Sequence, residues 1–224
     1  MKYLLLVIVM LSLSEAKEWQ ILKPLSQYKA SDYKLKKGVE VLELREYKIN
    51  SKEELMPLAY RKVLTIYQKP LKSFSSSTIK QFKELKPLIH SRNDFGILSY
   101  DFVGHGCRYL YNGVMIDSSG QVFKMDTKAD FIGFFDEINS DAEVQLATFL
   151  NKRLEGIKYR KVAQGYEVIV VAAFKAGAPN TKCKESTYSV IINTKGDMLS
   201  DILMNEKELE IDCIYGGEYL CAKE

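Results

Sequence analysis

The feature that most constrains this chain is a series of short apolar segments separated by glycine-containing turns, which begins near residue 95. Segments of strand length are expected at 96–103, 108–111, 114–117 and 121–125, and again at 159–162, 166–174, 187–193 and 198–203. The connections between them are short, and short connections join antiparallel neighbours. The pattern therefore predicts antiparallel β meanders.

Four turns are expected in these meanders, one of them at Ala163-Gln164-Gly165. Asn112-Gly113 is the strongest hairpin signal, because both residues tolerate positive φ. The stretches 115–122 and 191–198 resemble each other, each with a glycine near its centre. We interpret them as two hairpin turns with the same chemistry; a duplicated αβ unit is the alternative.

Apolar residues at helical spacing predict helices at 51–67, 78–86, 128–138 and 140–154. Ser140 and Glu143 have the spacing of a capping box, as do Ser51 and Glu54. A strand is expected at 39–49, with a bulge or burial on both faces because its apolar residues change face. The expected fold class is α+β, with antiparallel β meanders (hairpins) and two pairs of helices packed on one side, stapled by disulfides.

The N-terminus has the organisation of a bacterial-like signal peptide. Lys2 precedes an apolar run at 3–13, and Ser14 and Ala16 supply small residues at the cleavage positions. Cleavage after residue 16 predicts an exported protein, periplasmic or secreted, with no stable membrane span after cleavage. An uncleaved membrane anchor, with a structural or anchoring role for the protein, is the alternative.

Two regions are expected after the signal at 1–16. Residues 17–92 form an N-terminal strand plus helices, packed on the rest because they bury too little surface alone. Residues 93–224 form an α+β domain of a meander, two helices and a second meander.

Export gives the four cysteines a structural meaning, because an oxidising compartment favours disulfides. Four cysteines allow three connectivities. We favour Cys213 with Cys221, since Gly216-Gly217 between them is a turn signal, which leaves Cys107 with Cys183.

Charge and composition exclude several classes of function. The chain has 32 Lys+Arg and 29 Asp+Glu, a net charge of +3 with both signs interspersed, so no nucleic-acid partner is expected. Lys80, Lys83 and Lys86 have the spacing of a solvated helix face. The two histidines show no metal-ligand spacing, so neither a metal nor a cofactor is expected.

The candidate catalytic residues are His105 and Cys107, which point to the same face of an extended segment. A disulfide role for Cys107 competes with this interpretation. The chain has 14 tyrosines, and Tyr215 and Tyr219 in the expected cysteine loop are candidate binding residues. Tyr109 and Tyr111 fit either a core or a recognition surface.

The sequence therefore favours an exported, non-enzymatic binding or interaction module for a protein or a cell-envelope component. The alternative is a small exported hydrolase or thiol enzyme that uses Cys107 and His105.

Overall fold

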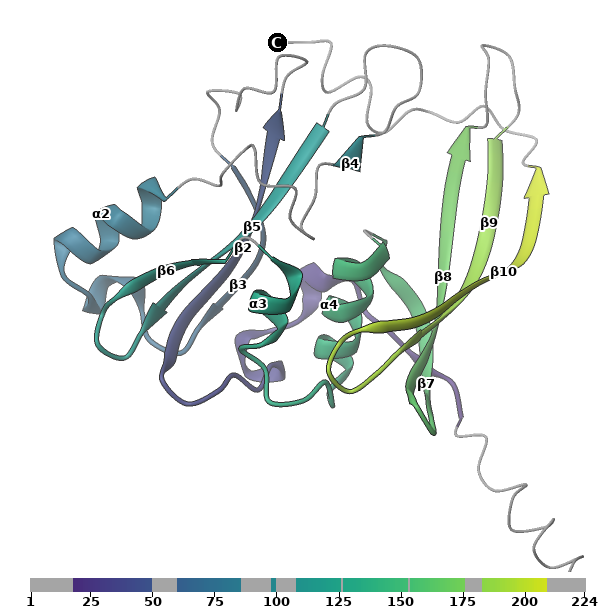
Figure 1. Ribbon diagram of the computed structural model, residues 1–224, viewed down its shortest axis with the longest axis horizontal. Coiled ribbons are helices and arrows are strands. Elements are labelled where there is room, and N and C mark those ends of the chain that lie inside the picture. Colours follow the sequence, from purple (N-terminus) through teal and green to yellow (C-terminus); the bar gives the residue numbers. More distant parts are fainter. Residues whose placement is uncertain are drawn as a thin grey trace, which may run out of the picture.

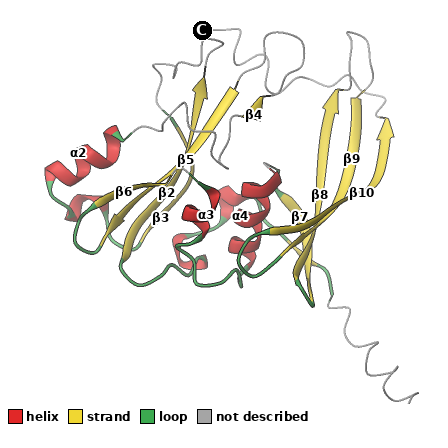
Figure 2. Cartoon of the chain, viewed as in Figure 1, coloured by secondary structure: helices red, strands yellow, loops and turns green. Residues whose placement is uncertain are grey.

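A computed structural model describes residues 18–49, 60–85, 98–99, 108–125, 127–152, 154–175 and 183–208. The described residues form two antiparallel sheets, each with five strands. Two helices, α3 and α4, lie between the sheets, and a third, α2, lies on the outer side of one sheet (Figure 1). The cartoon in Figure 2 shows this layering of helices and strands.

The first sheet has the strand order β1-β7-β8-β9-β10. Its strands are β1 (Gln20–Ile21), β7 (Gly156–Val162), β8 (Gly165–Lys175), β9 (Cys183–Ile192) and β10 (Met198–Glu208). Each pair of neighbours is antiparallel, and the register between β9 and β10 shifts twice, at Met198/Ser200 and at Leu203/Asn205.

The second sheet has the order β3-β2-β5-β4, with β6 also paired to β5. Its strands are β2 (Val39–Ile49), β3 (Arg61–Tyr67), β4 (Leu98–Ser99), β5 (Arg108–Asp117) and β6 (Val122–Met125). Strand β2 pairs with β5 over its whole length, so the N-terminal part of the chain and the part after residue 107 share one sheet.

The helices of the described residues are few and short. The α-helices are α2 (Ser76–Glu84), α3 (Lys128–Ile132) and α4 (Asp141–Lys152), and three 3-10 helices span Leu25–Gln27, Ala30–Asp32 and Leu71–Ser73. Every residue of α4 from Ala142 to Leu150 is buried, because the helix is enclosed between the sheets. Tyr111 of β5 packs edge-on against Phe149 of α4, with ring centroids 5.8 Å apart.

Helix α2 covers the opposite face of the second sheet. Phe82 of α2 is 1% exposed and packs in a separate apolar cluster with Val41, Val114 and Ile116. Helices thus lie on both faces of this sheet, which differs from the expected two pairs of helices on one side. The α+β class and the antiparallel sheets are confirmed.

Two predictions from local pattern are wrong. Asn112-Gly113 does not form a turn, because β5 continues through it. A Cβ on Gly113 would lie 2.5 Å from Cδ2 of Phe131, so the glycine allows α3 to approach the strand. The segment 61–67, expected as the end of a helix, is strand β3, where Leu64 and Ile66 alternate into the core.

Other predictions from local pattern are confirmed. Strand β2 has the expected bounds and is buried on both faces, from Val41 to Arg45. The stretches 115–122 and 191–198 form the same turn: Gly120 and Gly196 both have φ +84°. In each turn a side-chain oxygen, of Asp117 or Asn193, accepts two backbone N–H groups at 2.9 Å.

The capping box at Ser140 and Glu143 is also confirmed, and it does more than cap a helix. The buried Glu143 carboxylate accepts the backbone N–H groups of Asn139 at 2.9 Å and Ser140 at 3.1 Å. Its other oxygen accepts the N–H of Lys34 at 2.7 Å. One side chain therefore fastens both the start of α4 and the N-terminal segment.

Candidate interaction surface

Most of the residues singled out as candidate sites lie outside the described part of the chain: His105, Cys107, Cys213, Tyr215, Tyr219 and Cys221. Cys183 begins β9, opposite Lys175 of β8. The disulfide pairings therefore remain predictions. Of the other tyrosines considered, Tyr111 is a core residue, 4% exposed.

The outstanding surface feature of the described residues is strand β10. It has 11 residues and forms the end of its sheet, paired with β9 on one side. Most of its residues are exposed. Five large apolar side chains lie within seven consecutive positions, with exposed fractions as follows: Met198 38%, Leu199 53%, Ile202 58%, Leu203 51% and Met204 59%.

The position of α4 explains why β10 is uncovered on the face toward this helix. The helix packs against the inner face of β7 and β9. At its last turn, Lys152 reaches across the Tyr188 ring, 4.3 Å from the centroid, and pairs with Asp201 of β10 at 2.5 Å. That ion pair joins the end of α4 to β10, and the apolar residues beyond Asp201 stay exposed.

Apolar side chains are exposed on both faces of β10. Ile202 pairs in register with Ser189, on the face that also carries Ile169 of β8. Leu203 pairs with Tyr188, on the face toward α4. A strand added beside β10 would therefore gain apolar contacts above and below the sheet.

The charged side chains of β10 are paired within the molecule. Asp201 pairs with Lys152, Glu206 with Lys184 of β9 at 2.6 Å, and Lys207 with Glu185 at 2.7 Å. The apolar side chains are thus the part of this strand left to interact with something else.

Two other sheet edges in the described residues, β1 and β3, are shorter than β10. Strand β1 has two residues, too few to accept a long partner strand. Strand β3 carries the exposed cations of Arg61 and Lys62. Short length and charge are common protections of an edge strand. Strand β10 is long, and beside its charged residues it carries five exposed large apolar side chains.

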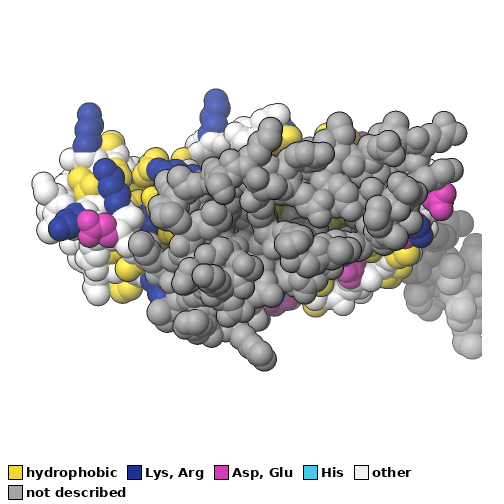
Figure 3. Space-filling view, turned by 90° about the horizontal axis from the view of Figure 1, so that it is seen from above, with side chains coloured by type: hydrophobic (Ala, Val, Ile, Leu, Met, Phe, Trp, Pro, Cys, Tyr) yellow, Lys and Arg dark blue, Asp and Glu magenta, His cyan; other side chains and the backbone are white. Residues whose placement is uncertain are grey.

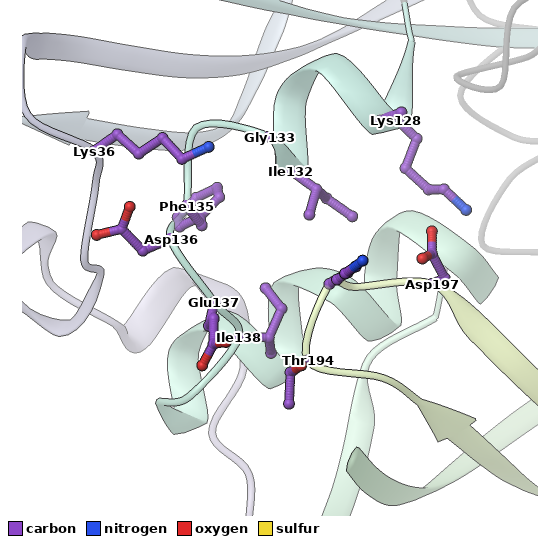
Figure 4. A pocket seen from close by; sticks show the side chains of 12 residues that line it. Lys36, Lys128, Ile132, Gly133, Phe135, Asp136, Glu137, Ile138, Thr194 and Asp197 are labelled. Carbon is purple, nitrogen blue, oxygen red and sulfur yellow. The ribbon is translucent and has the colours of Figure 1, made fainter. Parts of the chain in front are cut away.

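A second candidate is a cavity of about 360 Å³, where α3 and the loop after it meet the turn between β9 and β10 (Figure 4). Ile132, Phe135 and Ile138 supply its apolar lining. Its charged lining residues are three lysines and three acids: Lys36, Lys128, Lys195, Asp136, Glu137 and Asp197. Because the two signs balance, the cavity favours no ligand charge.

Charge elsewhere on the molecule follows the expectation of a solvated surface. Lys80 and Lys83 of α2 are exposed, as predicted from their spacing. Figure 3 shows Lys and Arg side chains at the end of the molecule that holds α2, next to acidic ones. The described residues contain no group of three or more His, Cys, Asp or Glu that could hold a metal ion.

Comparison of the chain with protein-family models, with curated proteins and with solved structures finds no match. Among the helices of the described residues, none is long and apolar enough to cross a membrane. A functional conclusion therefore depends on the geometry of the chain itself.

The sequence contains a partial signal for β10. A strand was expected at 198–203 and is found at 198–208. Five apolar residues in seven, without strict alternation, could also have described a strand buried on both faces. That β10 is instead an open edge depends on where α4 ends.

Proposed function

We propose that this protein is an exported, non-enzymatic interaction module that binds an extended segment of a protein chain along β10. The observation that carries the proposal is the 11-residue open strand with five exposed apolar side chains. Strand addition supplies affinity through main-chain hydrogen bonds, and the side chains on either face supply selectivity.

The physical argument is that an exposed apolar edge is costly to keep. An unpaired strand edge is a template for other chains, and natural proteins protect such edges when no partner uses them. Here β1 is short and β3 carries exposed cations, whereas β10 is long and carries five exposed large apolar side chains. A partner that covers β10 removes this liability and buries the apolar side chains of 198–204.

Photo-crosslinking in cells that produce the protein tests the proposal. A photoreactive residue replaces Ile202 in one variant and Tyr67 of β3 in the matched control, since Tyr67 is also on an edge strand and is 39% exposed. We expect a discrete protein adduct from position 202 and none from position 67. Absence of any adduct at 202, or equal adducts at both positions, would refute the proposed binding surface.

Export is part of the proposal and has its own test. The intact mass of the protein from the exported fraction, with a free-thiol assay, is expected to show Lys17 as the first residue and no free thiols. A chain that retains residues 1–16 would contradict cleavage. A reactive thiol at Cys107 would favour the thiol enzyme instead.

A further inference from the structure

We infer that the partner of β10 is the β10 strand of a second copy of this chain, paired antiparallel about a two-fold axis. This inference rests on the proposed function, because it names the partner of the same surface. It joins two five-stranded sheets edge to edge into one continuous sheet.

The first argument is closure. Two identical edges that pair antiparallel form an isologous contact, which is complete at two copies. Head-to-tail pairing of β10 with the far edge of the same sheet would instead produce an open chain of molecules. That far edge is β1, with two residues against the 11 of β10, so it cannot accept the strand.

The second argument is charge. Like charges placed directly opposite each other across a strand pair are destabilising. On β10, Asp201, Glu206 and Lys207 are already paired with Lys152, Lys184 and Glu185 of the same molecule. Two β10 strands can therefore approach without an uncompensated charge on these three residues.

The third argument is the match of side chains in one register. With the two-fold axis at Leu203, this leucine faces its own copy within the exposed apolar segment 198–204. An axis at Asp201 or Glu206 would instead place two carboxylates directly opposite each other.

Sedimentation of the purified mature protein over a range of concentrations tests the pairing. We expect a reversible dimer for the wild type and for the control Ile157→Lys, which replaces an isoleucine 47% exposed on β7 of the same sheet. Leu203→Lys places two cations at the axis and is expected to weaken the dimer by at least about tenfold. Its circular dichroism and urea midpoint should match those of Ile157→Lys, because both positions are on the surface.

Disulfide trapping tests the register. Residues directly opposite each other in an antiparallel pair have Cα atoms about 5 Å apart, within reach of a disulfide. Leu203→Cys is expected to give a reducible covalent dimer under mild oxidation, whereas Lys207→Cys should give no more than the wild type.

The possible results separate the two proposals. A monomeric wild type, or equal trapping at positions 203 and 207, would overturn the self-pairing. If photo-crosslinking from position 202 then joined a different protein, the proposed binding function would stand with another partner. If the protein were monomeric and also gave no adduct from position 202, both the self-pairing and the proposed binding function would be refuted.

Discussion

The guanidinium Nε of Arg45 donates to Oε1 of Glu43 over 2.6 Å, and both side chains are completely buried on β2 beneath α2. The remaining nitrogens of Arg45 donate to two backbone carbonyls at the end of α2, that of Phe82 at 2.8 Å and that of Leu85 at 3.2 Å. Arg45 also lies over the rings of Tyr60 and Phe82. One cation thus satisfies carbonyls that a helix end leaves unpaired and holds α2 on the sheet.

Arg45→Met is expected to destabilise the protein strongly, because it removes the buried cation and leaves the buried Glu43 carboxylate paired with the half-exposed Lys62 alone. Removal of one partner of a buried pair costs about 3–5 kcal/mol. The exposed pair of Lys69 with Glu40 is the matched control, and Lys69→Met should cost about 0–1 kcal/mol. Urea unfolding measures both. Equal costs for the two variants would show that Arg45 does not hold α2.

Glu143→Gln tests the junction at the start of α4. A glutamine keeps the size of the side chain but replaces one acceptor oxygen with an NH2 group, which would face backbone N–H donors. The expected loss is about 2 kcal/mol in the free energy of unfolding. Glu84→Gln, at an exposed position of α2, is the control and should be close to neutral. A neutral Glu143→Gln would contradict the assigned role.

Gly113→Ala tests the close approach of β5 and α3. The added Cβ would meet Cδ2 of Phe131 at 2.5 Å and Cε of Met125 at 3.0 Å, so one of the elements must move. Overpacking of this kind costs about 1–3 kcal/mol. Phe131→Leu in the same chain should recover part of the loss, which a double-mutant cycle measures. If the costs of Gly113→Ala and Phe131→Leu were additive, the strain caused by the added Cβ would not arise from contact with Phe131.

Stability is expected to fall as pH rises above about 10. Burial raises the pKa of Tyr33, Tyr159 and Tyr166 above the ordinary value of 10.0, and for Tyr159 the hydrogen bond to Asp141 raises the pKa further. Above pH 10 the unfolded chain binds fewer protons at these tyrosines than the folded one does, so the slope of stability with pH is negative there. Below that range these groups are protonated in both states and contribute no pH dependence.

Two phenylalanine variants distinguish the contributions of Tyr33 and Tyr159 to the loss of stability at alkaline pH. The hydroxyl of Tyr33 is buried without a hydrogen-bond partner, so Tyr33→Phe should cost little at pH 7 and should flatten the alkaline loss. Tyr159→Phe should also flatten that loss but should destabilise at pH 7, because it leaves Asp141 without the phenol. Urea midpoints from pH 8 to pH 11 give both slopes. If the slope of the urea midpoint with pH were unchanged in both variants, the raised pKa values of Tyr33 and Tyr159 would be contradicted.

The sequence alone determined the features that depend on a few neighbouring residues. The Ser140–Glu143 capping box and the two turns around Gly120 and Gly196 follow from local hydrogen bonds and positive φ, so the pattern is sufficient to predict them. Strand β2 was also predictable, since its apolar residues on both faces indicate burial between layers. The α+β class follows from the sum of such segments.

Tertiary structure decided the features that depend on which strands and helices pack against a segment. Asn112-Gly113 has the residues of a hairpin turn, but Gly113 lies within a strand because β5 pairs there with β2 and β6, and Phe131 occupies the space that a side chain would need. Segment 61–67 became a strand because β2 offered a partner along its length. The exposure of Leu203, on the face toward α4, was decided by the end of that helix at Lys152. The sequence specifies which residues are apolar, but the elements packed around an apolar side chain determine whether it is buried or exposed to a partner.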